Sequence, residues 1–166
     1  MKTFGRSGRL SAIAIATMLG SSVLLDWTMA GPSFAAARKY YLTKATFAGD
    51  AAATACDPGY HMASRWEVVE TTALQYDTRR GITAADSGSG PPTEEFGWIR
   101  TGYRPILTGG PGVSNCLAWS SGDPGVDGTY AGIGGGWGVD TAPFVNRWAM
   151  EEGSCGTPHH VWCVRD

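Results

Sequence analysis

The side chains that most directly imply covalent chemistry are four cysteines, Cys56, Cys116, Cys155 and Cys163. An even number of cysteines in a small exported domain is typical of structural disulfides. Four cysteines permit three pairings, and spacing alone does not choose among them, although only seven residues separate the last two. Because every thiol is expected in a disulfide, none is left to act as a nucleophile.

Two adjacent histidines, His159 and His160, are the next groups with possible acid–base chemistry. A hydrolase would need one of them within hydrogen-bond reach of a carboxylate such as Glu94 or Glu151. Neighbouring side chains in a strand point to opposite faces, so at most one of the two could face a given pocket. The pattern favours an exposed pair at the start of a strand, and no catalytic residue is predicted. His61, in an apolar segment, is interpreted as a core or boundary residue.

Tryptophan is the residue type best suited to ligand contact in this sequence. Trp137 lies in a run of glycines where few side chains could bury it, so its indole is expected either to plug the domain or to face a partner. For Trp119 and Trp148 the same choice leans towards packing. The predicted ligand-binding residues are Trp137, Asp140, Trp119, Asn146 and Trp148. The aromatic residues expected in the core are Trp98, Trp162, Tyr41 and Phe47.

Residues 1–37 have the composition of an export signal peptide. Lys2, Arg6 and Arg9 precede an apolar run over residues 10–25, and the alanines at 35–37 provide a cleavage site. The apolar run is interrupted and short for a membrane span, and no cysteine lies near the cleavage site for lipidation. We therefore expect a secreted or periplasmic protein that has no membrane attachment after cleavage.

The remaining domain, residues 38–166, has the length of one ordinary domain. Removal of the signal peptide changes 13 basic and 15 acidic residues to 10 and 14. No basic run of the kind that neutralises phosphates remains, so nucleic acid is not an expected partner. The sequence leaves the oligomeric state open.

Short elements separated by loops are expected to position these residues. One helix is predicted to begin at Asp50, as its cap, and to end near Cys56. A second is predicted from Ser64 to Leu74, because Glu67 lies three residues after Ser64, the spacing of a capping box. Aromatic and β-branched content predicts strands over residues 38–43, 96–101, 116–120 and 161–164. The fold class is therefore α+β.

The order of these motifs resembles that of the C-type lectin-like domain. Its opening is similar to Tyr40-Tyr41-Leu42, a helix ending in Cys56, and residues 59–64 before an acidic helix. Its central strand is similar to Trp98-Ile99, and its closing strand to His160-Val161-Trp162-Cys163-Val164. The element Cys116-Leu117-Ala118-Trp119 also resembles the endostatin-like branch of that fold and related bacterial exported domains. The resemblance covers nearly all of residues 38–166.

The resemblance implies two short helices, small antiparallel sheets, long loops and two nested disulfides, Cys56 with Cys163 and Cys116 with Cys155. It also implies that the segment between Cys116 and Cys155 is the variable, ligand-binding part of the fold. The calcium-dependent sugar binders of the family carry Glu-Pro-Asn or Gln-Pro-Asp and Trp-Asn-Asp tripeptides, which this sequence lacks. The N-terminal histidine cluster of endostatin-like zinc sites is also missing. No metal and no cofactor are therefore expected.

Together these features predict an exported, non-catalytic binding module that recognises an extracellular protein or glycan without calcium. Two alternatives remain open. One is an exported hydrolase that uses His159 or His160 with a carboxylate. The other is a purely structural surface component.

Overall fold

The computed structural model describes residues 37–70, 73–133 and 148–166. All of these belong to the second of two units into which the chain divides, Ala35–Asp166. The predicted signal peptide, apart from its last residue, lies outside the described residues. The predicted ligand-binding residues Trp137, Asp140 and Asn146 lie outside them as well.

The described residues form an α+β domain with three short helices and seven strands. In chain order the elements are β1 (Arg38–Leu42), α1 (Gly49–Ala52), β2 (Tyr60–Met62), α2 (Arg65–Val69), β3 (Leu74–Tyr76), β4 (Phe96–Trp98), α3 (Cys116–Trp119), β5 (Asp127–Gly132), β6 (Ala149–Ser154) and β7 (His160–Arg165). None of the three helices in the described part of the chain has the length and apolar character that a membrane crossing needs.

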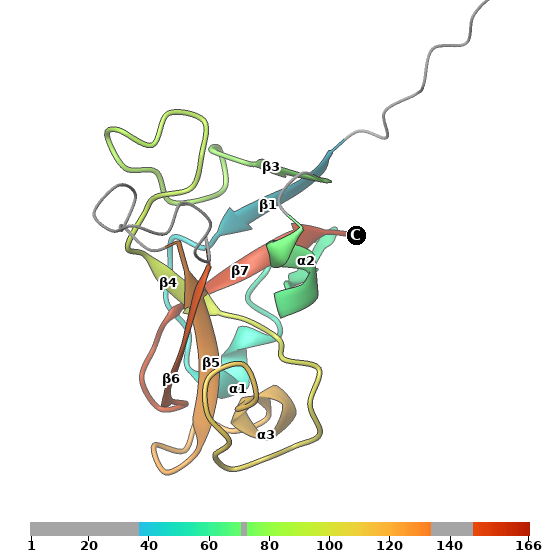
Figure 1. The fold of residues 1–166 in the computed structure, drawn as a ribbon, viewed down its shortest axis with the longest axis vertical. Coiled ribbons are helices and arrows are strands. Elements are labelled where there is room, and N and C mark those ends of the chain that lie inside the picture. The colour runs from blue at the N-terminus through green and yellow to red at the C-terminus, as the bar shows by residue number, and fades with distance from the viewer. Residues whose placement is uncertain (1–36, 71–72, 134–147) are drawn as a thin grey trace, which may run out of the picture. The chain divides into compact units, whose positions relative to one another are not determined.

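Strand β7 has neighbours on both of its edges. Its residue Val164 pairs with Tyr40 of β1 and with His61 of β2, both antiparallel, so β1 and β2 lie on opposite edges of β7. On the edge shared with β2, β4 joins β7 in parallel (Figure 1). The strand order is β3-β1-β7-β4-β5-β6, with β2 attached to β7. Since β1 also pairs with β3 in parallel, the sheet is mixed, and the predicted small antiparallel sheets are a wrong description.

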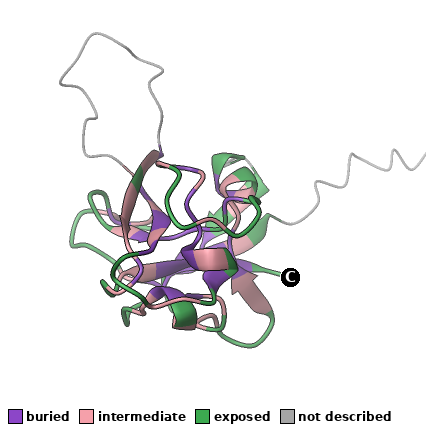
Figure 2. Ribbon diagram, turned by 90° about the horizontal axis from the view of Figure 1, so that it is seen from below, coloured by how far each residue is buried: buried purple, intermediate pink, exposed green. Residues whose placement is uncertain are grey.

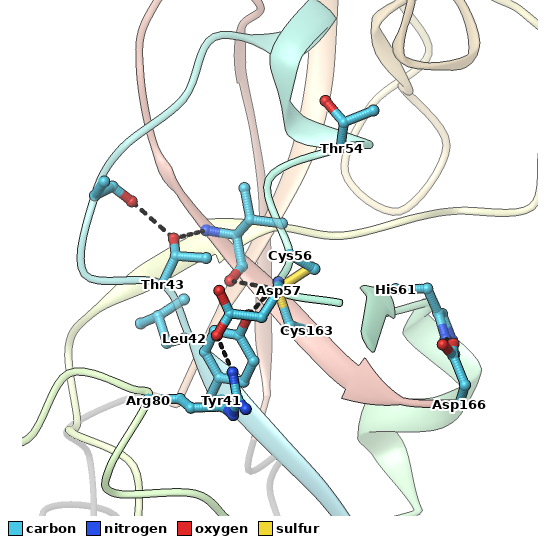
Figure 3. The surroundings of a disulfide bond; sticks show 12 residues. Tyr41, Leu42, Thr43, Thr54, Cys56, Asp57, His61, Arg80, Cys163 and Asp166 are labelled. Carbon is cyan, nitrogen blue, oxygen red and sulfur yellow. Dashed lines mark hydrogen bonds and ion pairs between the residues drawn. A yellow bond between two sulfur atoms is a disulfide. The ribbon is translucent and has the colours of Figure 1, made fainter. Parts of the chain in front are cut away.

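Two disulfides have the nested pairing that the resemblance implies. Cys56 is joined to Cys163 of β7, 107 residues later, and Cys116 to Cys155. All four cysteines of the chain are therefore paired. Beside the first disulfide, the Tyr41 hydroxyl accepts a 2.8 Å hydrogen bond from the backbone N–H of Asp57 (Figure 3). In a chain-entropy model, closing the loop of 107 residues between Cys56 and Cys163 stabilises the folded state by about 5 kcal/mol.

The core consists of aromatic and aliphatic side chains from the strands, the short helices and the segments between them, while the loops carry most of the exposed residues (Figure 2). The prediction that Trp98, Trp162 and Tyr41 are core residues is confirmed, and Phe47 is half-buried against them. Both fully buried indoles have hydrogen-bond partners, because Trp98 Nε1 donates to the Phe47 carbonyl at 2.8 Å and Trp162 Nε1 to the Ala131 carbonyl at 2.7 Å. The N–H groups of these two indoles are therefore satisfied. The buried Nε1 of Trp148 has no hydrogen-bond partner within the described residues.

The first two helices are shorter than predicted. Helix α1 begins at Gly49 and ends at Ala52, and its N-cap residue is Ala48 without a side-chain cap, so the prediction that Asp50 caps it is wrong. Helix α2 has the predicted capping box between Ser64 and Glu67 but ends at Val69. Leu74, the predicted end of this helix, is instead the first residue of β3, which pairs with β1.

Residues 116–120 were predicted to form a strand, and this prediction is wrong, because residues 116–119 form the helical turn α3. Cys116, Leu117, Ala118 and Trp119 have φ values of 49°, 54°, 58° and 64°, so α3 is a single left-handed turn made of non-glycine residues. Each such residue costs about 1–2 kcal/mol relative to the right-handed form. The Cys116–Cys155 disulfide and the side chain of Asn115, whose Oδ1 accepts a 3.0 Å hydrogen bond from the Ala118 N–H, hold the turn in place.

Candidate functional site

Two of the predicted ligand-binding tryptophans are packed inside the domain. Trp119 is 8% exposed and meets Trp98 edge-on at 5.6 Å between ring centroids. Trp148 is 6% exposed and meets Trp162 edge-on at 4.8 Å. The packing alternative therefore describes both, and neither presents an indole face to solvent.

A different tryptophan is the exposed one. Trp66, in the first turn of α2, is 63% exposed, and Val69, three residues later on the same helix, is 53% exposed. Residues three apart are neighbours on a helix surface. Between them Val68 is fully buried, so α2 turns one side chain into the core and leaves Trp66 and Val69 on its outer face.

Helix α2 is short, but its N-terminus is well fixed. The Ser64 hydroxyl accepts from the Glu67 N–H, and the Glu67 carboxylate accepts from the Ser64 N–H at 2.9 Å. Backbone hydrogen bonds in both directions between residues 63–65 and Arg100 join this turn to the segment after β4. The indole of Trp66 therefore stands on an anchored backbone.

Arg65 orders the indole further. Its guanidinium carbon lies 4.2 Å from the centre of the Trp66 ring, and its Nη1 donates a 2.9 Å hydrogen bond to the Gly112 carbonyl. A cation held over an indole in this way is attracted by the electron-rich face of the ring. A Cβ atom added at Gly102 would lie 3.8 Å from Trp66 Nε1, so this glycine is near the indole, and the next residue, Tyr103, is 51% exposed. We call Arg65, Trp66, Val69 and Tyr103 the Trp66 surface.

The loop between β4 and α3, which includes Tyr103 and borders this surface, is held by buried polar contacts. The Asn115 side-chain amide donates to the carbonyls of Tyr103 at 2.9 Å and Arg104 at 3.0 Å. Further along the loop, Glu152 of β6 accepts hydrogen bonds from the Gly110 N–H at 3.0 Å and from the Ser114 hydroxyl. The Ser114 hydrogen bond is the main reason that the pKa of Glu152 lies below its ordinary value. The loop is thus supported by Glu152 of β6 and by the buried side chain of Asn115.

The predicted pair of exposed histidines is not exposed. His159, just before β7, and His160, its first residue, are both half-buried. His159 stacks on Tyr130 with 4.4 Å between ring centroids and meets Trp98 edge-on at 4.6 Å. The prediction was wrong because the aromatic side chains of β4 and β5 cover this position, which sequence neighbours do not reveal.

The acid–base pairs that a hydrolase would need are not formed within the described residues. No hydrogen bond or ion pair there joins either histidine to Glu94 or Glu151. Glu151 instead accepts a 3.0 Å hydrogen bond from the Tyr130 hydroxyl. The nearest carboxylate contact of the pair is His160 Nε2 with Glu95 Oε2, at 3.9 Å.

His61 has the boundary position predicted for it, but it also has two carboxylate partners. Its Nδ1 lies 2.6 Å from Asp166 Oδ1 and its Nε2 lies 3.0 Å from Glu67 Oε1. Burial alone would raise the pKa of Glu67, yet hydrogen bonds from Ser64 and His61 lower it to about 2. In the described part of the chain, no group of three or more histidine, cysteine or acidic side chains could hold a metal ion.

The sequence contained a weak signal for Trp66 that prediction did not use. In the capped helix, Trp66 and Val69 share one face and Val68 lies on another, so only one of these two apolar faces can meet the core. Composition alone does not say which of them it is.

No protein-family model, curated protein or solved structure matches this chain.

Proposed function

We propose that this protein is an exported, non-catalytic binding module that recognises an extracellular protein or glycan without calcium, and that the Trp66 surface is a contact site for that ligand. One observation carries the proposal: an indole that is 63% exposed stands on a capped helix with an arginine stacked over it. A large apolar side chain such as tryptophan is unfavourably exposed to water unless a ligand or partner covers it. Trp and Arg also contribute most of the binding energy at many interfaces.

The proposed architecture is that of a C-type lectin-like domain. Its support is the nested pairing of Cys56 with Cys163 and of Cys116 with Cys155, together with the antiparallel pairing of β1 with β7. Disulfides persist in oxidising compartments, which supports a secreted or periplasmic location. The missing calcium tripeptides support binding without that ion.

The ordered state of the Trp66 surface favours binding over flexible exposure. Arg65 is held by Gly112, and the neighbouring loop is held by Asn115, so little side-chain freedom is lost when a ligand arrives. Flat aromatic faces with a guanidinium beside them suit both the C–H faces of sugars and the surfaces of proteins. Trp137, predicted as the anchor of a binding surface between Cys116 and Cys155, lies outside the described residues and remains a prediction.

A binding screen on the oxidised domain tests the proposal. Glycan and protein arrays identify the ligand, and Trp66→Ala is then expected to weaken binding at least about tenfold, with little change in melting temperature. Leu107→Ala is the matched control, because Leu107 is 58% exposed and lies outside the Trp66 surface. Trp137→Ala separates the two candidate contacts. Unchanged affinity of Trp66→Ala for an authenticated ligand would contradict the proposed site.

A further inference from the structure

The imidazole of His61 lies between two carboxylates that come from different elements. Asp166, directly after β7, approaches Nδ1 at 2.6 Å, and Glu67 of α2 approaches Nε2 at 3.0 Å. Figure 3 shows the side chains of His61 and Asp166 facing each other at the end of β7. His61 itself belongs to β2, so the ring contacts a helix and the end of a strand at once.

The protonation state of the ring decides how many of these contacts are hydrogen bonds. An ionised carboxylate oxygen can only accept, whereas a neutral imidazole has one N–H and one bare nitrogen. Both contacts are hydrogen bonds only when both ring nitrogens carry protons, and they are then charge-assisted. In the neutral ring, one nitrogen lone pair faces a carboxylate oxygen and that contact becomes repulsive.

The other charged groups around the ring do not replace these bonds. Arg38 of β1 donates to Glu67 Oε1 at 3.2 Å and to the carbonyl of Arg165, so it helps to hold Glu67 in place. Arg165 of β7 lies opposite Tyr60 in the strand pairing, one residue from His61. Because neighbouring strand residues point to opposite faces, Arg165 lies on the Tyr60 side, and the groups around the ring are two carboxylates and Arg38. Histidine is the side-chain type that ordinarily changes charge between pH 5 and 8.

We propose that His61 is a proton-dependent clasp. When its ring is protonated, it holds α2 and the end of β7 together; when the ring is neutral, it loses its hydrogen bond to one of these two elements and releases it. The clasp is independent of the proposed function. Its effect on ligand binding rests on that function. Glu67 follows Trp66 directly in α2, so losing the hydrogen bond between His61 and Glu67 would loosen the helix that carries Trp66.

The test compares stability at pH 5.5 and pH 8.0 for the wild type, Asp166→Asn, His61→Gln and the double variant. Asp166→Asn is expected to raise the unfolding equilibrium constant about threefold at pH 5.5 and to change it little at pH 8.0, the size of a partly exposed ion pair. In the His61→Gln background that pH difference should disappear. Asp166 is 62% exposed at its side chain, so its replacement does not disturb the core.

His160→Gln is the matched control, because His160 has one carboxylate nearby, Glu95 at 3.9 Å, rather than two. It should leave the Asp166→Asn effect unchanged. An Asp166→Asn effect of equal size at both pH values, or one that persists without His61, would overturn the clasp. If the clasp holds, but affinity measured with an identified ligand does not fall between pH 5.5 and 8.0, only its link to the Trp66 surface is overturned.

Discussion

Tyr130 and His159 lie ring against ring, with 4.4 Å between their centroids and 18° between their planes. Gly153 makes this stack possible, because a Cβ atom there would lie 2.7 Å from Tyr130 Cε1. Burial of the imidazole, together with the charge of His160, lowers the pKa of His159. The folded protein therefore favours the neutral ring at this position.

The lowered pKa of His159 predicts a loss of stability in mild acid. An unfolded histidine takes up its proton near pH 6.5, above the pKa of the folded state, so the unfolded chain binds the proton first as pH falls. The contribution of His159 is full above about pH 6.5 and is lost as pH falls through the lowered folded pKa. His159→Phe keeps an aromatic ring that cannot be protonated. Urea unfolding of both proteins at pH 5.0 and 7.5 should give a smaller acid loss for the variant, and equal losses would contradict this account.

Glu67 predicts a second loss at much lower pH. Its pKa falls from an ordinary 4.5 to about 2 in the folded protein, so its contribution is full above pH 4.5 and is lost as pH falls towards 2. The carboxyl carbon signal of Glu67, followed by NMR, should still report an ionised group at pH 3.5. Glu67→Gln should remove this part of the acid dependence, whereas Glu94→Gln, in an exposed loop, controls for the loss of one negative charge. A carboxyl signal that titrates near pH 4.5 would be the contrary result.

The left-handed turn predicts an unusual response to glycine. Ala118 is exposed and has a φ of 58°, so Ala118→Gly removes about 1–2 kcal/mol of backbone strain while adding about 0.5–1 kcal/mol of chain entropy cost. The variant should be as stable as the wild type or up to about 1.5 kcal/mol more stable. Ala51→Gly, in α1, is the control and should lose about 1 kcal/mol. Chemical denaturation measures both, and equal losses would show that the turn is not strained.

Calcium independence is predicted from the two missing tripeptides. Melting curves recorded with millimolar calcium and with a chelator should coincide, because the chain lacks the paired side-chain oxygens with which calcium-dependent C-type lectins bind this ion. A rise of several degrees with calcium would indicate a site that involves other residues.

The sequence was most informative where a local rule operates between neighbours. Ser64 and Glu67 predicted a capping box because both partners lie within one helical turn, and the strand at the end of the chain was predicted from its own β-branched and aromatic residues. The disulfide pairing needed the resemblance, since cysteines distant in sequence carry no local sign of their partners.

The features that sequence missed depend on contacts between distant segments. His159 is covered by Trp98 and Tyr130, which belong to other strands, and nothing near His159 in sequence indicates this. The turn at residues 116–119 has the composition of a strand, but a disulfide and Asn115 impose a left-handed backbone. The exposure of Trp66 depends likewise on which side of α2 meets the core.

The position of β7 between β1 on one edge and β2 and β4 on the other has a consequence for how the protein can be made. All three neighbours are synthesised before β7, and Cys56 must also wait for Cys163. Until residues 160–165 have emerged, these strands have unpaired edges, which are prone to pair with other chains. Folding of this domain is thus postponed until β7 has been synthesised, and a chain cut short before His160 should aggregate or be degraded rather than form a smaller version of the domain.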